Sequence, residues 1–163
     1  MTRYASETTV SADRSRGEIE WLLKKYGASG FGYMWKGTSA VIMFEMQDRR
    51  IRFTLPLPEK TDPKYLKTPG GRTRHKVSPD RLDDLWEQDC RVSWRALTLC
   101  IKAKLESVAS KIESFEEAWL SHVVLPDGRT VSEAVQPQID SAYKTGKMPP
   151  LLLGAASEQR PSA

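Results

Sequence analysis

Hydrophobic residues recur at helical spacing over a long segment, which we expect to form one helix from Pro79 to about Ile112. At about 100° per residue, two adjoining stripes of apolar and small side chains leave only a narrow polar strip for water. Ser78 is a natural N-cap, and Pro79 suits the first helical position. A helix that is apolar on two sides needs two partners, so we expect a sheet on one side and another helix or subunit on the other. The first stripe contains Leu82, Trp86, Cys90, Ser93, Leu97, Ile101, Leu105 and Val108, and the second contains Leu85, Val92, Ala96, Leu99 and Ala103.

Three strand-like runs precede this helix. They cover residues 31–35, 40–46 and 50–57. A two-residue turn at Gln47-Asp48 would place Glu45 opposite Arg50, and it would give the second and third runs one shared apolar face. Agreement between the two patterns favours an antiparallel meander in this register.

The face that Phe31, Tyr33 and Trp35 occupy depends on the turn at Lys36-Gly37-Thr38. With a two-residue turn these aromatics join the buried face, which is favoured because large aromatics near a sheet centre are usually buried. With a three-residue turn they lie on the outer face beside Arg50 and Arg52. They would then form an aromatic and basic platform of the kind that stacks bases.

Capping boxes predict the remaining helices. One begins at Ser15-Arg16-Gly17-Glu18 and ends at Gly27, and a short one begins at Ser114-Phe115-Glu116-Glu117. A third begins at Thr130-Val131-Ser132-Glu133, bends or restarts near Pro137, and ends at Gly146. The expected fold class is α+β: an N-terminal helix, a three-stranded antiparallel meander, a long central helix and two or three shorter C-terminal helices.

The chain is expected to form one domain over residues 15–153. A flexible N-terminus at 1–14 and a flexible tail at 154–163 flank it, because both are polar and aperiodic. Within the domain, Leu151-Leu152-Leu153 is expected to pack back as an apolar strap.

Positive charge is concentrated in one part of the chain. The formal net charge is +4, and the segment between Glu59 and Lys76 accounts for the whole excess. Clustered cations are typical of a phosphate-binding surface, and the alternative is a solvated loop that its charge keeps soluble. Ordinary helical ion pairs, such as Glu87 with Arg91, are the alternative explanation on the long helix. The candidate nucleic-acid-binding residues are Arg50, Arg52, Lys64, Lys67, Arg72, Arg74, Lys76, Arg91 and Arg95.

No catalytic, cofactor or metal-binding signature is present in the sequence. The only histidines, His75 and His122, have no partner at metal-ligand spacing. Cys90 and Cys100 lie about 15 Å apart along the expected helix, so they are interpreted as reduced thiols of a cytoplasmic protein. No apolar run approaches the roughly 18 residues of a membrane span. We therefore expect a non-enzymatic protein without cofactor, metal or membrane contact.

Three further stretches are distinctive: Trp94-Arg95-Ala96-Leu97 with Ile101-Lys102-Ala103-Lys104-Leu105-Glu106, Leu125-Pro126-Asp127-Gly128-Arg129-Thr130-Val131, and Ala142-Tyr143 with Met148-Pro149-Pro150-Leu151-Leu152. Together they resemble small phage- and prophage-encoded proteins. This resemblance implies an early phage function inside a bacterial cell. The order of elements alone is similar to the phage single-strand annealing proteins, in which a basic groove binds DNA and subunits form rings.

Two functional hypotheses follow. The first is a nucleic-acid-binding protein, for single-stranded DNA first, that acts in phage replication or recombination as a possible homo-oligomer. The second is a phage-encoded protein-interaction module that inhibits or adapts a host protein. On that hypothesis Leu85, Val92 and Leu99 on the long helix, with the strap at 151–153, form the interface.

Overall fold

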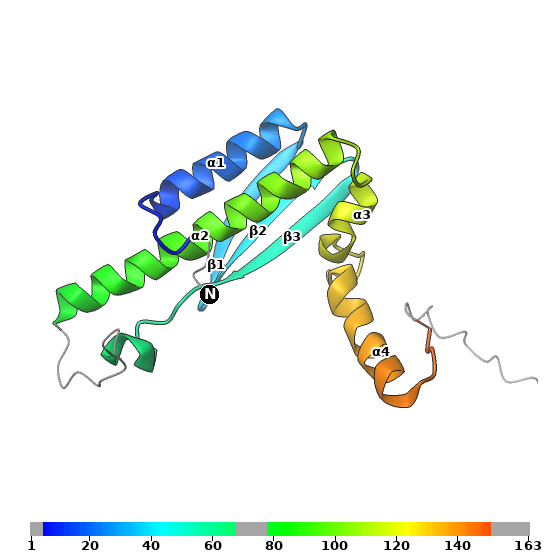
Figure 1. Cartoon of the computed structure of the whole chain (residues 1–163). Coiled ribbons are helices and arrows are strands. Elements are labelled where there is room, and N and C mark those ends of the chain that lie inside the picture. Colours follow the sequence, from blue (N-terminus) through cyan, green and yellow to red (C-terminus); the bar gives the residue numbers. More distant parts are fainter. Residues whose placement is uncertain (1–4, 68–77, 151–163) are drawn as a thin grey trace, which may run out of the picture.

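The chain folds into an α+β structure in which two helices lie on one face of a three-stranded sheet (Figure 1). This computed structural model describes residues 5–67 and 78–150. The predicted fold class is confirmed, and the long central helix is the organising element. The elements are α1 (Ala12–Lys25), β1 (Gly30–Lys36), β2 (Ser39–Met46), β3 (Arg49–Pro56), η1 (Pro63–Leu66), α2 (Pro79–Ala109), α3 (Phe115–Trp119), η2 (Leu120–His122) and α4 (Val131–Thr145).

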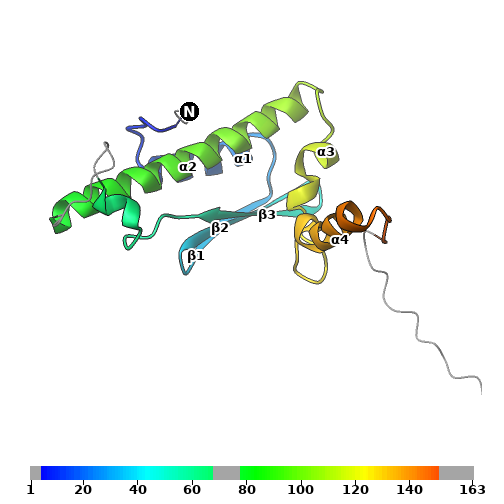
Figure 2. The same ribbon diagram turned by 60° about the horizontal axis from the view of Figure 1, so that its bottom comes forward.

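The sheet is an antiparallel meander in the order β1-β2-β3, and α1 and α2 form a layer over one of its faces (Figure 2). Glu45 pairs with Arg50 across β2 and β3, so the predicted register is confirmed. Gln47 and Asp48 form the two-residue turn, and both have positive φ angles, as a type I′ turn requires. Apolar side chains of β2 and β3 therefore alternate into the core beneath the helices. The strand residues buried in this core are Ala40, Ile42, Phe44, Met46, Ile51 and Phe53, whereas Val41 is buried on the opposite face.

The first hairpin settles which face the β1 aromatics occupy. Lys36 pairs with Ser39, which leaves a two-residue turn whose Gly37 has a φ of +59°. Phe31, Tyr33 and Trp35 consequently share the core face with their partners on β2. The hypothesis that these aromatics form a platform on the outer face is therefore wrong. However, Tyr33 is 46% exposed and Trp35 57% exposed, because both lie toward the open end of an edge strand.

Helix α2 begins at its predicted cap, where the Ser78 hydroxyl accepts a hydrogen bond from the Arg81 N–H. Its two partners are the sheet and α1. The predicted second stripe is only partly correct: Val92 is buried, but Ala96 and Ala103 are exposed. Trp94 and Thr98 are buried in its place.

Trp94 and Thr98 are buried because α1 packs beside α2. Thr98 donates hydrogen bonds to the carbonyl of Trp94 at 2.9 Å and to the Ser15 carbonyl of α1 at 3.3 Å. A polar threonine can be buried at this helix contact because its hydroxyl is satisfied.

Helix α1 starts earlier than its sequence signals predicted. Its N-cap is Ser11, whose hydroxyl accepts from the Arg14 N–H at 3.2 Å, so the predicted start at Ser15 is wrong. Ser15 is fully buried inside the helix, on the same face as Ile19. Part of the segment placed in the flexible N-terminus contacts α2: Ala5 is buried, and Gln88 donates to the Thr8 carbonyl at 2.9 Å.

The C-terminal elements close one end of the core. Both predicted capping boxes are present, at Ser114 with Glu117 and at Thr130 with Glu133. Trp119 is fully buried and contacts phenylalanines of β2, β3 and α3 edge-on or tilted. Helix α4 then runs through Pro137 without restarting and projects away from the sheet (Figure 1). The predicted strap at 151–153 and tail at 154–163 lie outside the described residues.

Candidate functional site

The two predicted cations on β3 lie on the outer face of the sheet, opposite the helices. Arg50 contacts its cross-strand partner Glu45 at 3.4 Å, and both side chains are more than half exposed. Exposed pairs of this kind contribute about 0–1 kcal/mol, so Arg50 remains accessible to another ligand.

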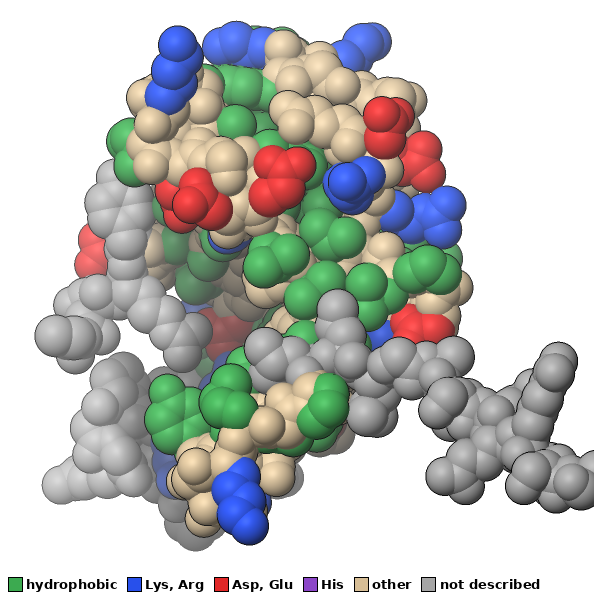
Figure 3. All heavy atoms as spheres, turned by 90° about the vertical axis from the view of Figure 1, so that its right-hand side faces the viewer, with side chains coloured by type: hydrophobic (Ala, Val, Ile, Leu, Met, Phe, Trp, Pro, Cys, Tyr) green, Lys and Arg blue, Asp and Glu red, His purple; other side chains and the backbone are tan. Residues whose placement is uncertain are grey.

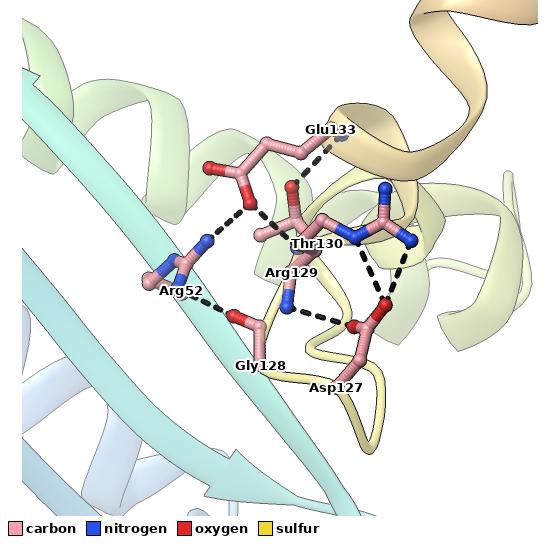
Figure 4. Close-up of polar contacts among 6 residues, drawn as sticks. All are labelled: Arg52, Asp127, Gly128, Arg129, Thr130 and Glu133. Carbon is pink, nitrogen blue, oxygen red and sulfur yellow. Dashed lines mark hydrogen bonds and ion pairs between the residues drawn. The ribbon is translucent and has the colours of Figure 1, made fainter.

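Arg52 is part of a cluster of polar contacts rather than a free cation (Figure 4). Its guanidinium donates to the Gly128 carbonyl at 2.8 Å and contacts the Glu133 carboxylate directly. Glu133 also caps α4 by accepting from the Thr130 N–H at 2.8 Å. The Thr130 N–H and the Arg52 charge both favour the ionised carboxylate, so the pKa of Glu133 is lowered. Arg52 therefore connects β3 to the first turn of α4.

The beginning of the predicted basic segment is attached to α2. Lys64 contacts Asp89 at 2.8 Å, and the buried Tyr65 donates its hydroxyl to the same carboxylate at 3.0 Å. Burial and Asp89 together raise the pKa of Tyr65 to about 12. Lys67 follows η1 and is exposed. The other predicted cations of this segment, Arg72, Arg74 and Lys76, lie outside the described residues.

The predicted cations on α2 are paired as well, and they lie in the helix layer. Arg91 contacts Glu87 at 3.0 Å, one helical turn away, as the alternative explanation anticipated. Arg95 contacts Glu18 of α1 at 2.5 Å, and both side chains are about one-third exposed or less. The structure therefore does not bring Arg91 and Arg95 together with Arg50 and Arg52, which face the opposite side of the sheet.

Charge is balanced over the described part of the chain. Residues 5–67 and 78–150 contain equal numbers of acidic and basic side chains, so the excess of +4 is carried entirely by the other residues. A surface that holds several phosphates requires a local excess of cations. The five described cations on α2, β3 and in η1 that are paired with acids do not supply one.

The outer edge of β1 is the most distinctive surface of the fold. Among the described residues, no strand pairs with this edge, whereas an antiparallel bridge joins Ile51 of the opposite edge strand to Val123. The hairpin closes on a hydrogen-bonded pair at Lys36 and Ser39, and bonding alternates along an antiparallel ladder. The N–H and C=O groups of Phe31, Tyr33 and Trp35 therefore point away from β2, toward the open edge.

Apolar side chains accompany this open edge. Tyr33, Met34 and Trp35 are each about half exposed, and Lys36 is the only basic side chain on the strand. Tyr33 is held in place by Arg16, whose guanidinium lies 5.0 Å from the ring centre, and by Trp94 in an edge-on contact. Natural edge strands usually carry charges, prolines or bulges that prevent pairing, and β1 has few of these features.

Met34 also borders a hollow on the outer sheet face. The hollow has a volume of about 460 Å³, and Val41 and Met43 form its apolar floor while Arg52 and Glu133 border it on the β3 side. Side chains of a strand added beside β1 would therefore have apolar surface to contact on the outer face as well as backbone groups at the edge.

Comparison with protein-family models, curated proteins and solved structures finds no match for this chain. No helix in the described ranges is both long and apolar enough to cross a bilayer. Within residues 5–67 and 78–150, no group of three or more His, Cys, Asp or Glu side chains could hold a metal ion.

Sequence reasoning identified the β1 aromatics but not the open edge. The pattern shows which side chains alternate, but it cannot show which of two edge strands later elements cover. A usable signal was present: the run from Gly30 to Lys36 contains three large aromatics and only one charge, at its end. Such a composition is unusual for a strand that meets water.

Proposed function

We propose that this chain is a non-enzymatic protein-interaction module that binds an extended segment of another protein along the outer edge of β1. The observation that carries the proposal is an edge strand whose outward backbone groups pair with no other described residue, together with half-exposed Tyr33, Met34 and Trp35. An added strand gains affinity from main-chain hydrogen bonds and specificity from alternate side chains. Lys36 favours a partner segment with an acidic residue at that end.

The resemblance to phage-encoded proteins gives this module a biological setting. A small phage protein that captures a strand of a host protein would act as an inhibitor or adaptor in the bacterial cytoplasm. The predicted interface at Leu85, Val92 and Leu99 is not part of this proposal, because Val92 is buried within the fold.

The test is selection of peptide ligands followed by a substitution in the edge. A displayed library of random seven-residue peptides, the length of β1, supplies the probe. Trp35→Lys should weaken binding of a selected peptide by about tenfold or more, because a lysine at an edge opposes strand addition. Trp21→Lys is the matched control: Trp21 of α1 is 59% exposed and Trp35 is 57% exposed.

Backbone chemistry then distinguishes strand addition from simple apolar contact. Methylating alternate amides of the selected peptide should abolish binding in one register and leave it intact in the other, because only every second N–H of an added strand faces β1. A peptide that tolerates methylation at every position, or that binds Trp35→Lys normally, would refute the proposal.

Single-stranded DNA binding is the second candidate. Arg50 supports it, because this arginine is exposed on the outer sheet face and its ion pair with Glu45 is a weak one. The test is anisotropy of a labelled oligonucleotide at about 50 mM salt, where binding through several phosphates is strong. A triple variant would combine Arg72→Ala, Arg74→Ala and Lys76→Ala. If this variant lost DNA binding while Arg91→Ala retained it, this candidate would be favoured over the first.

A further inference from the structure

Two glycines interrupt the outer face of β1. Gly30 and Gly32 lie on this face, where they pair with Glu45 and Met43 of β2. Neither glycine has a positive φ angle, so a residue with a side chain could adopt the same backbone conformation. A Cβ atom at Gly32 would meet nothing within 4 Å, and a Cβ atom at Gly30 would approach only the Glu45 carboxylate, at 3.9 Å. No described residue therefore requires glycine at either position, although glycine weakens a strand.

The two glycines leave an open notch on the outer sheet face. This glycine notch has a volume of about 200 Å³, and its lining includes Met43, Glu45 and Arg50. Because β1 is an edge strand, a strand added beside β1 would lie next to the notch. Exposed hydrophobic side chains also gather on the side of the molecule that α3 and α4 form (Figure 3), so exposure by itself does not identify a binding surface. The glycine notch is different, because a glycine inside a strand is typical of a place where another chain or a ligand approaches closely.

An added strand would bring one side chain directly over this notch. Gly32 directs its backbone groups toward β2, so the residue opposite Gly32 in the added strand belongs to a non-hydrogen-bonded pair. The Cα atoms of such a pair are only about 4.5 Å apart, and their side chains are closest. Since Gly32 has no side chain, a large side chain opposite it can lie across β1 and contact Met43. Aromatic rings compensate edge glycines in this way in other sheets.

Arg50 favours an aromatic ring over an aliphatic side chain in the glycine notch. Its guanidinium lines the notch and is more than half exposed, and its contact with Glu45 at 3.4 Å is a weak one. Guanidinium groups bind the faces of aromatic rings. An aromatic side chain also contributes a large contact area at a low cost in conformational entropy.

We propose that the segment bound along β1 carries an aromatic residue opposite Gly32, with its ring in the glycine notch, and an acidic residue opposite Lys36. Lys36 lies on the same face as Gly32, so the two partner residues are four positions apart. This sequence preference rests on the proposed strand addition and defines which segments the edge selects. The acidic residue comes first in an antiparallel partner strand and second in a parallel one.

The experiment measures how peptides selected on the unaltered chain bind to Gly32→Leu, in which the protein's own side chain fills the glycine notch. The selected seven-residue peptides should share an aromatic and an acidic residue four positions apart. Gly32→Leu should weaken binding of such a peptide by about tenfold or more, as loss of an aromatic anchor does. It should have little effect on the same peptide with alanine in place of the aromatic residue. Gly17→Leu is the matched control and should leave binding unchanged, because Gly17 is an exposed glycine of α1 at which a Cβ atom also meets nothing within 4 Å.

Two further variants test the glycine and the charge separately. Gly32→Ala should not lower the free energy of unfolding, and a loss of stability would show that the strand itself requires glycine and would overturn the proposal. Lys36→Glu should weaken binding of the selected peptide, and exchange of the peptide's acidic residue for lysine should restore it. Failure of this exchange to restore binding would overturn the pairing with Lys36.

The response to Trp35→Lys distinguishes failure of the aromatic anchor from failure of strand addition. Selected peptides that Trp35→Lys weakens but that lack the aromatic residue, or that bind Gly32→Leu normally, would overturn the aromatic anchor and leave strand addition standing. Peptides that Trp35→Lys does not weaken would overturn strand addition itself, and the anchor with it.

Discussion

Replacing Arg52 should loosen α4 from the sheet without unfolding the core. Arg52 is the side chain through which β3 holds the turn before α4 and the first turn of the helix, by way of the Gly128 carbonyl and the Glu133 carboxylate. Arg52→Met keeps the aliphatic part of the side chain and removes both polar contacts. If Arg52 instead served only to hold phosphate, the same substitution would leave the stability of the protein unchanged.

The size of the effect follows from exposure. The Arg52 side chain is 21% exposed and that of Glu133 is 50% exposed, so solvent screens their ion pair substantially. We expect about 0.5–1 kcal/mol from the pair, as for other partly exposed ion pairs. The hydrogen bond to the Gly128 carbonyl adds about 1 kcal/mol. The free energy of unfolding should therefore fall by about 1.5–2 kcal/mol in Arg52→Met.

Glu133→Gln is the second variant of this test. Glutamine can still complete the capping box with Thr130, but it carries no charge to pair with Arg52. The two single variants and the double variant form a double-mutant cycle measured by urea denaturation. The cycle should give a coupling of about 0.5–1 kcal/mol. Amide exchange in α4 should accelerate in Arg52→Met more than exchange in α2, because the loss is local.

Either of two results would contradict this role of Arg52. A coupling free energy of zero would mean that the contact between Arg52 and Glu133 has no energetic role. Equal acceleration of exchange in α2 and α4 would mean that Arg52 supports the whole fold and not the attachment of α4.

Three further predictions concern the core and its titrating groups. Trp119→Ala should lower the free energy of unfolding by about 3–5 kcal/mol in urea denaturation, because the indole is fully buried at the end of the core; a loss below about 1 kcal/mol would contradict that packing. His122 stacks on Phe53 at 3.9 Å between ring centres, and burial, with Lys104 nearby, lowers the pKa of His122 below its ordinary 6.5. The unfolded state therefore binds this proton more readily, so stability should fall as the pH drops below about 6.5, and His122→Gln should flatten that slope in melts at successive pH values. In an ultraviolet titration Tyr65 should be the last tyrosine to ionise, near pH 12. The step near pH 12 should be absent from the titration curve of Tyr65→Phe, which would assign that step to Tyr65. Ionisation of every tyrosine near pH 10 would contradict the buried hydroxyl bonded to Asp89.

Local signals in the sequence predicted most of the elements. The Ser78 cap, the two C-terminal capping boxes and the pairing of Glu45 with Arg50 all depend on residues within a few positions of each other, or across one hairpin. Where two local signals competed, the prediction failed: Ser11 and Ser15 are both acceptable caps, and only the burial of Ser15 against α2 selects the first. The burial of Trp94 and Thr98 likewise depends on where α1 lies.

The candidate site was less predictable because its contacts join distant segments. Arg52 and Glu133 are 81 positions apart, and Arg95 and Glu18 are 77 apart. Nothing local to either arginine indicates that a carboxylate will meet it. The openness of the β1 edge is a property of the same kind, since it depends on which edge the segment around Val123 covers. Composition located the aromatics, but only the arrangement of the elements showed that their backbone groups face solvent.

The most direct measurement of the central claim is amide hydrogen exchange along β1, residue by residue, in the free protein and with a selected peptide bound. In the free protein, the amides of Phe31, Tyr33 and Trp35 should exchange rapidly and those of Gly32 and Met34 slowly, because only the latter bond to β2. On binding, the rapid set should become protected while the slow set is unchanged. Uniform protection along β1 in the free protein, or no gain at Phe31, Tyr33 and Trp35 on binding, would contradict an open edge that accepts a partner strand.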